Sequence, residues 1–197
     1  MNRFAQLFTE LDTTTSTNAK VLAMQRYLDA VPAHDAAWAV YFLSGGKPRQ
    51  VVRTATLRTL ACEVAGLSDW LFDECYQAVG DLAETIAHVL PPSPTVASTL
   101  GLAQWVEERL LPLRGLPDDE IAQRIKSYWQ QLDTQGRFLL TKLVGGGFRV
   151  GVSKLLVQRA IAAHAGIDPK RVAQRMMGYT DGKAKPTAIK YEAVRAV

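Results

Sequence analysis

The residues of this chain best suited to chemistry form a glycine-rich basic segment at positions 143–154, Leu-Val-Gly-Gly-Gly-Phe-Arg-Val-Gly-Val-Ser-Lys. This segment lies between two runs with helical periodicity, residues 137–144 and 153–165. Glycine lets a backbone approach a ligand closely, and the free amide groups at the start of a helix suit an anion. Because Arg149 and Lys154 lie beside those amides, the segment predicts a phosphate-binding loop.

A similar segment occurs 100 residues earlier in the chain. Residues 45–49 (Gly-Gly-Lys-Pro-Arg) align without a gap with residues 145–149 (Gly-Gly-Gly-Phe-Arg), and seven positions are identical between 38–66 and 138–166. Most of the other aligned positions keep their apolar or polar character. One helix–basic loop–helix unit is therefore present twice. Two such loops suit a repeating, symmetric polyanion, and duplex nucleic acid is the obvious candidate.

The two loops provide small residues at their tips and cations on their flanks. A tip of small residues fits a narrow groove, and Lys and Arg side chains reach phosphates. The cations are Lys47, Arg49, Arg53, Lys142, Arg149 and Lys154. Asn and Gln, which would read base edges beside Arg, are sparse in both loops, so contact with backbone and groove shape is favoured over sequence readout. The alternative is a hairpin turn whose charge is incidental.

Catalytic and metal-binding patterns are not found in the sequence. Adenylyl transfer needs a nucleophilic lysine, usually in a Lys-x-Asp-Gly context, whereas residues 179–182 read Tyr-Thr-Asp-Gly and are interpreted as a turn after a helix. The loop at 145–153 lacks both the Gly-Lys-Ser/Thr ending and the preceding strand of a P-loop. Two cysteines and three scattered histidines complete no zinc pattern. The sequence therefore predicts no catalytic residue and no metal site.

Residues 152–179 also have the pattern of a helix-turn-helix, with residues 165–168 as the turn. The side chains that would then face a major groove are Lys170, Arg171, Gln174 and Arg175. The same turn recurs at 65–68, where acidic residues such as Asp69 and Asp73 follow it, and an acidic copy could not read DNA. The shared turn thus favours an architectural role, with a sequence-specific regulator as the alternative.

Charge is distributed unevenly along the 197 residues. Net charge is only +4, yet residues 137–197 contain 12 Lys and Arg residues against 3 Asp and Glu residues. Such asymmetry suggests a basic face for a polyanionic partner. No apolar stretch reaches membrane-spanning length, and the N-terminus opens into an amphipathic helix rather than a signal peptide. We therefore expect an intracellular protein with no membrane partner.

Helical periodicity dominates the chain, and strand patterning is almost absent. In the second expected helix, which begins near Asn18, the apolar face is assigned to Val21, Leu22, Met24 and Leu28. The expected helices cover about 4–11, 18–31, 36–43, 56–65, 68–79, 81–90, 100–111, 121–132, 137–144, 153–165, 169–177 and 187–197. The sequence thus predicts an all-α fold of about twelve helices in two pseudo-two-fold related halves. The clearest break is the Pro-Pro-Ser-Pro run at 91–94.

In the order and spacing of its motifs, the chain resembles the N-terminal DNA-binding domain of ATP-dependent DNA ligases of the bacterial and archaeal type. The resemblance spans essentially the whole chain, and its specificity comes from the order and spacing of the motifs. The matching pieces are residues 4–12 with the Thr-rich segment after them, 38–43, 79–84, 147–153, 168–169 and 176–178. The first loop, residues 45–53, departs more from the family pattern than the second does.

The resemblance implies one helical DNA-binding domain over residues 1–178, with pseudo-repeats at about 1–90 and 100–178, and the start of a linker at 179–197. It implies that the domain grips the minor groove and the phosphate backbone of nicked duplex DNA without sequence preference. On that reading, the residues that contact phosphates are Lys47, Arg49, Arg53, Lys142, Gly147, Arg149, Gly151, Ser153 and Lys154.

The resemblance further implies that the chemistry of nick sealing belongs to catalytic domains of the same polypeptide that this chain lacks. ATP and Mg²⁺ are expected there, and no cofactor is expected in this chain, which has no adenylation lysine motif and is not an enzyme by itself. A monomer in the cytoplasm, associated with the nucleoid and serving DNA repair or replication, is the expected setting. The alternative from a different class is a helical protein-interaction module whose duplicated hairpins form a partner surface.

Overall fold

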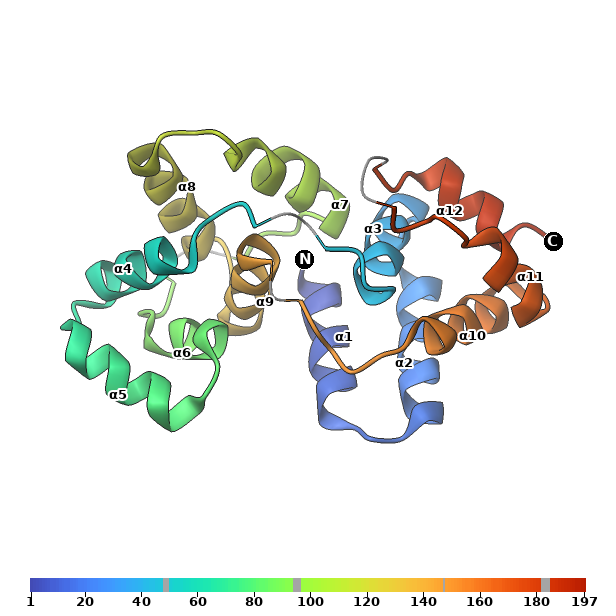
Figure 1. Cartoon of the computed structure of the whole chain (residues 1–197), viewed down its shortest axis with the longest axis horizontal. Helices are drawn as coiled ribbons and strands as arrows, with labels where there is room; N and C mark the ends of the chain where they lie inside the picture. Colours follow the sequence, from blue (N-terminus) through green and yellow to red (C-terminus); the bar gives the residue numbers. More distant parts are fainter. Residues whose placement is uncertain (48–49, 94–96, 147, 182–184) are drawn as a thin grey trace. The chain divides into compact units, whose positions relative to one another are not determined.

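The computed structural model describes residues 1–47, 50–93, 97–146, 148–181 and 185–197. Within these ranges the chain has twelve α-helices and no strand, which confirms the predicted all-α class (Figure 1). The first six are α1 (Asn2–Thr13), α2 (Thr17–Ala30), α3 (Ala33–Leu43), α4 (Thr54–Ala65), α5 (Asp69–Val79) and α6 (Leu82–Val89). After the proline-rich break come α7 (Leu102–Trp105), α8 (Asp118–Gln130), α9 (Thr134–Gly145), α10 (Lys154–Ala165), α11 (Pro169–Arg175) and α12 (Ala188–Arg195).

Short polar side chains define where several of these helices begin. The Ser16 hydroxyl accepts a hydrogen bond from the Ala19 amide at the start of α2, and the Asp133 carboxylate accepts one from the Gly136 amide at the start of α9. Asp168 caps α11, whose first residue is a proline that has no amide to satisfy. Among the described residues, no helix combines the length and apolar character needed to cross a bilayer.

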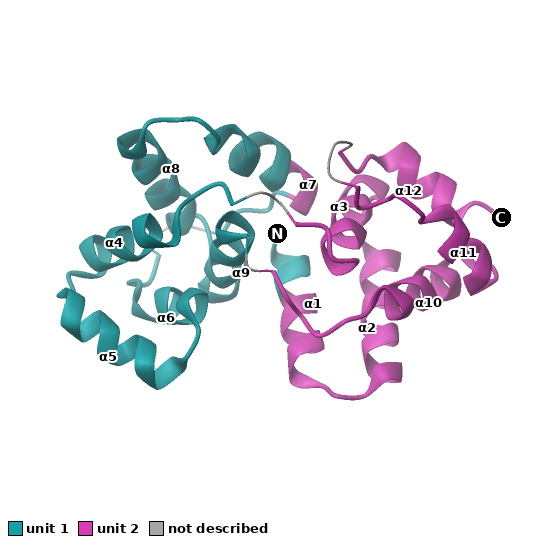
Figure 2. Ribbon diagram, viewed as in Figure 1, with its two compact units in different colours: residues 1–5, 48–100, 105–147 teal, residues 6–47, 101–104, 148–197 magenta. Residues whose placement is uncertain are grey.

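The chain forms two compact units (Figure 2). Unit 1 contains residues 1–5, 48–100 and 105–147, and unit 2 contains residues 6–47, 101–104 and 148–197. Each unit therefore takes segments from both halves of the sequence. Two of the points at which the chain passes from one unit to the other, after residue 47 and after residue 147, fall inside the repeated glycine-rich basic segment.

Unit 1 is organised around α9, which packs against α6, while α4 packs against α5, α6 and α8. Its buried residues are mostly apolar, and among the described residues of unit 1 the one buried charged side chain is Arg137 on α9, which is only 5% exposed. The Arg137 guanidinium donates to the carbonyl of Trp129 at the end of α8 and to that of Pro91, both at 2.7 Å. Burial lowers the pKa of this guanidinium, and the two carbonyl groups compensate part of its lost hydration. Arg137 thus ties three segments of unit 1 together.

Unit 2 is built on two helix pairs. Helix α2 packs along α10, and α3 packs against α12, with α11 contacting both α10 and α12. Tyr191 and Val194 of α12 are buried against this framework, although they lie close to the end of the chain. The turn predicted at 179–182 is confirmed as far as Asp181: Gly178 has φ +77°, and the Asp181 amide donates to its carbonyl at 3.1 Å, while Gly182 lies outside the described residues.

The duplication read from the sequence is visible in the backbone. Helices α4 and α10 begin and end 100 positions apart, and the glycines that end them, Gly66 and Gly166, have nearly the same left-handed conformation, φ +67° and +69°. In both copies the residue after the glycine donates to the carbonyl four residues before the glycine, Leu67 to Cys62 and Ile167 to Ala162. Because the same cap ends α4 before the acidic α5, the turn is an architectural feature of the repeat.

Two sequence-based predictions of local structure are wrong. Leu22 is 52% exposed, because α2 meets α10 through the face that carries Ala23, Met24, Tyr27 and Leu28. The single helix expected over 100–111 is divided: α7 is followed by a π-helical turn at Val106–Leu110 and a 3₁₀ turn at Leu111–Leu113. Pro112 lies in this last turn, where its missing amide and its ring are incompatible with a continuing α-helix.

Candidate nucleic-acid interface

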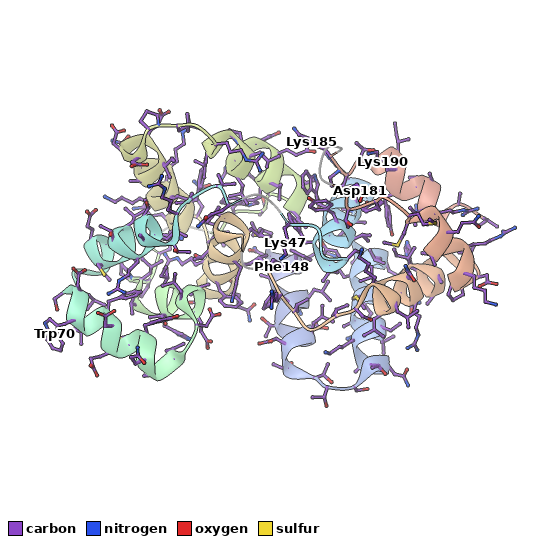
Figure 3. The ribbon with its side chains drawn as sticks, viewed as in Figure 1. Lys47, Trp70, Phe148, Asp181, Lys185 and Lys190 are labelled. Carbon is purple, nitrogen blue, oxygen red and sulfur yellow. The ribbon has the colours of Figure 1, made fainter. Side chains whose placement is uncertain are left out.

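Both copies of the glycine-rich basic segment contribute to one groove in unit 2. The groove has a volume of about 620 Å³. Lys47 and Phe148, from the two copies, appear beside each other in Figure 3 and both line it. The residues that line the groove are Phe42, Leu43, Ser44, Gly45, Lys47, Phe148, Arg149, Val150, Gly151, Val152, Ser153 and Lys154. This described lining contains three cationic side chains and no carboxylate, so its electrostatic potential favours an anion.

The second loop alternates between buried and exposed residues. Phe148 is 8% exposed, and its ring packs against the rings of Phe8 and Phe42, with centroids 5.3 and 5.8 Å apart. Val150 is also buried, whereas Arg149 between them is exposed. The two apolar side chains therefore anchor the loop to unit 2 and leave the Arg149 guanidinium facing solvent.

Gly151 gives this loop a left-handed turn that is held by a distant lysine. Its φ is +63°, a conformation that glycine adopts without strain. The Lys20 ammonium on α2 donates to the Gly151 carbonyl at 2.8 Å. Since the carbonyl and the following amide of a trans peptide point in opposite directions, this bond turns the Val152 amide away from Lys20. Among the described residues, the amides of residues 149–153 donate to no protein acceptor. The hydrogen-bonding capacity of these amides is therefore unused within the described part of the chain.

Ser153 and Lys154 place the start of α10 at the groove. The Ser153 hydroxyl accepts a hydrogen bond from the Leu156 amide at 3.3 Å, which leaves its own proton free to donate. Lys154 is the first residue of this twelve-residue helix and is exposed. The amides of the first turn and the helix dipole add partial positive charge at the same place.

Tyr41 holds the first loop through two hydrogen bonds. The Gly46 amide donates to the Tyr41 carbonyl at 2.8 Å, and the Tyr41 hydroxyl donates to the Lys47 carbonyl at 3.3 Å. A Cβ atom on Gly46 would lie 2.5 Å from that Tyr41 carbonyl oxygen and 2.7 Å from the Tyr41 ring. Glycine is therefore required here by close packing. Lys47 is exposed at the end of this turn.

The structure brings Lys47, Arg149, Gly151, Ser153 and Lys154 of the predicted site together in the groove. Two predicted residues, Arg49 and Gly147, lie outside the described residues. Arg53 and Lys142 belong to unit 1. Arg53 is exposed immediately before α4, where the Val51 and Val52 amides both donate to the Val144 carbonyl, at 3.0 and 3.2 Å.

Lys142 differs from the other predicted cations that the structure describes, because its charge already has a partner. Its ammonium pairs with the Asp81 carboxylate and lies 5.4 Å from the centroid of the Phe138 ring, and its side chain is 18% exposed. Burial alone would favour the neutral form of Asp81, but hydrogen bonds from Lys142 and from the Glu84 amide together lower the pKa of this carboxyl group. The ion pair between Lys142 and Asp81 therefore links α9 to the start of α6 within unit 1.

Two residues that line or support the groove could not be identified from the sequence. Lys20 lies 131 positions from the carbonyl that it holds. Ser44 follows α3; its hydroxyl is buried at the groove wall and has no hydrogen-bond partner among the described residues. Within the same described part of the chain, no three His, Cys, Asp or Glu side chains gather in a way that could hold a metal ion.

Comparison with known proteins connects this architecture to a family. A comparison with curated proteins gives no match. The family model described as the DNA ligase N terminus matches residues 1–162, which is most of the 197-residue chain and includes both copies of the basic loop. The chain is also all-helical over its described residues, as predicted from the resemblance. On this match, the chain belongs to the family of DNA ligase N-terminal domains.

Proposed function

We propose that the groove of unit 2 binds the sugar-phosphate backbone of nicked duplex DNA along the minor groove, without sequence preference. Membership of the ligase family implies a DNA partner and linked catalytic domains. The observation that carries the proposal is the meeting of the two basic loops, 100 residues apart in the chain, along one groove with three cations and no carboxylate. Duplex DNA presents regularly spaced phosphates to such a surface.

The groove offers three kinds of contact to phosphates. Lys47, Arg149 and Lys154 provide full charges, the amides near Gly151 provide neutral donors, and the start of α10 provides its dipole. None of these groups distinguishes one base pair from another, because phosphates carry no direct sequence information. The mode of binding is therefore backbone and shape recognition.

In this proposal the domain supplies affinity and positions the DNA ends, while the linked catalytic domains perform adenylyl transfer and nick sealing with ATP and Mg²⁺. The domain acts as a monomer in DNA repair or replication. Its residues contact the DNA and take no part in bond formation.

The test is fluorescence anisotropy with labelled nicked duplex, intact duplex and single strand over a series of salt concentrations. We expect binding to duplexes of unrelated sequence, weaker binding to the single strand, and a log K that falls with log salt by about 0.9 per phosphate neutralised. A preference for the nicked duplex over its intact counterpart supports nick recognition by this domain. Absence of duplex binding at low salt would overturn the proposal.

The first prediction concerns Arg149. Substitution Arg149→Glu should weaken duplex binding about tenfold or more, because a charge-assisted hydrogen bond to phosphate is replaced by repulsion. It should also lower the steepness of the salt dependence by about one phosphate contact. Since Arg149 is exposed, thermal unfolding should not change.

The matched control is Arg171→Glu on α11, which makes the same charge change at another exposed arginine. We expect this substitution to have the smaller effect. A larger loss for Arg171→Glu, together with discrimination between duplex sequences, would support the helix-turn-helix regulator instead. Salt-tolerant binding to a protein and none to DNA would support the protein-interaction module.

A further inference from the structure

Helix α5 of unit 1 buries very little of its surface. Of its eleven residues only Phe72 is buried. Trp70, which is labelled in Figure 3, is 68% exposed. The neighbouring Leu71 is 37% exposed. The other three tryptophans of the chain are each exposed by 4% or less. Trp70 is therefore the one tryptophan of the chain whose side chain is exposed to solvent.

The charge around α5 is opposite in sign to that of the groove. Residues 59–108 contain no Lys or Arg and eight Asp and Glu residues. Cations from outside this run pair with three of the acids: Arg58 with Asp73, Lys126 with Glu63, and Lys142 with Asp81. The remaining acids of α5, Asp69 and Glu74, form no ion pair with any described residue. Helix α5 thus keeps uncompensated negative charge beside an exposed indole.

Trp70 and Glu74 are one helical turn apart and so lie on the same face of α5. An arginine can stack its guanidinium on an indole ring and donate hydrogen bonds to a carboxylate at the same time. Tryptophan and arginine are also the side chains most enriched among energetically dominant residues of protein interfaces. The negative charge of this face disfavours phosphate groups, so its chemistry does not suit DNA.

We propose that α5 is a docking surface for an arginine-containing segment of another protein. An arginine of the partner stacks on Trp70 and pairs with Glu74, and apolar residues of the partner cover Leu71. This interaction is separate from the proposed DNA function: it uses no cation of the groove and does not depend on that function.

The test uses the whole 197-residue chain and a panel of synthetic peptides of about twelve residues, a length that can lie along α5 in a helical or an extended form. The peptides combine two arginines with leucines at varied spacings, and their counterparts carry glutamate in place of arginine. Because the other tryptophans are buried, a shift of tryptophan emission to shorter wavelength reports on Trp70. We expect this shift, with saturation, for arginine peptides and none for glutamate peptides.

Substitutions in the protein then locate the binding site. The affinity of each variant for a fluorescently labelled peptide is measured by fluorescence anisotropy. Trp70→Ala and Glu74→Lys should each weaken binding of the best arginine peptide about tenfold. Asp12→Lys, the same charge change at an exposed residue of α1, should leave it unchanged. Trp70→Ala removes no cation, so its affinity for duplex DNA should equal that of the unmodified chain.

Three outcomes would overturn the proposal. One is that no arginine peptide binds more tightly than about 1 mM, the affinity of a weak non-specific contact. Another is that peptide binding is equally strong in Trp70→Ala. The third is concentration-dependent dimerisation that Trp70→Ala abolishes, measured by sedimentation equilibrium, because the occupant of α5 would then be a second copy of this chain.

Discussion

Lys20 is the residue that connects α2 to the conformation of the second basic loop. Its ammonium holds the Gly151 carbonyl, and the opposed Val152 amide is left without an acceptor among the described residues. The lysine therefore acts on the groove through the backbone that it positions. Its side chain is partly exposed, so its contribution to the stability of the fold is modest.

We predict that Lys20→Met weakens duplex binding several-fold, because the Gly151 turn loses the bond that fixes it. The free energy of unfolding should change by less than about 1 kcal/mol. Lys20→Arg retains both the donor and the charge and should recover part of the affinity. If Lys20 instead contacted a phosphate directly, Lys20→Met would lower the slope of log K against log salt by about one contact, whereas a positioning role leaves that slope nearly unchanged. Anisotropy at several salt concentrations separates these cases, and equal affinities for Lys20→Met and the unmodified chain would refute the positioning role.

A second prediction at this scale concerns the glycines of the loops. Gly46→Ala should destabilise the protein by roughly 1–3 kcal/mol, because the new Cβ would overlap the Tyr41 carbonyl and ring. Gly145→Ala, in the second copy of the repeat, is the control: the nearest atom to its Cβ would be Leu57 Cδ1 at 4.0 Å, and it lies in the last turn of α9. Urea unfolding should show no loss for Gly145→Ala, and comparable losses for both would contradict the packing argument.

Among the helices, α6 and α9 are joined by a side chain with two roles. One oxygen of Asp81 accepts the Glu84 amide at 2.9 Å and so caps α6, and the other pairs with Lys142 on α9. The pKa of this carboxyl group is lowered from its ordinary value of 3.8. Ionised Asp81 therefore contributes stability that is fully present above the unfolded-state pKa and is lost as the pH falls through the lower folded-state pKa.

We predict that Asp81→Asn, which keeps a capping oxygen but loses the ion pair, destabilises unit 1 by about 0.5–1 kcal/mol near neutral pH. Asp81→Ala should cost about 1 kcal/mol more, because the cap is lost as well. Both differences from the unmodified chain should shrink as the pH is lowered below about 4, since the wild-type carboxylate then becomes protonated. Denaturant titrations at several pH values measure this, and a pH-independent difference for Asp81→Asn would exclude the ion pair as the cause.

Considered as a whole, the molecule extends beyond the part that matches the family model. That match ends at residue 162, whereas unit 2 continues to residue 197 and includes α11 and α12. Helix α12 packs against α3, and its Tyr191 and Val194 are buried. These residues belong to the compact unit that contains the basic groove.

We predict that removing residues 187–197 lowers the midpoint of thermal unfolding by about 6 °C or more. The burial of two apolar side chains, together worth about 3 kcal/mol or more, is lost from unit 2. Removal of Val197 alone, which is 97% exposed, should have no effect and serves as the control. An unchanged midpoint for the longer deletion would show that α12 does not stabilise unit 2.

Most of the helices could be predicted because their signals are local. The glycines at 66 and 166 and the proline at 169 act within a few residues: α4 and α10 end before these glycines, and α11 begins at Pro169, as the expected helix ranges have it. The exposed side of α2 could not be predicted, because a helix with apolar residues on two faces is oriented by its neighbour. The ion pair of Lys142 could likewise not be predicted, because its partner Asp81 lies 61 positions away.

The sequence alone determined the all-α class, the family and the existence of two related basic loops. Composition, helical period and a repeat spaced by 100 residues are all properties of neighbouring or aligned positions. Only the tertiary structure decided that Lys47 and Arg149 share one groove, that Lys20 holds Gly151, and that Lys142 is paired within unit 1. These facts depend on how distant segments pack, and the free energy of such packing is set by contacts that no local pattern contains.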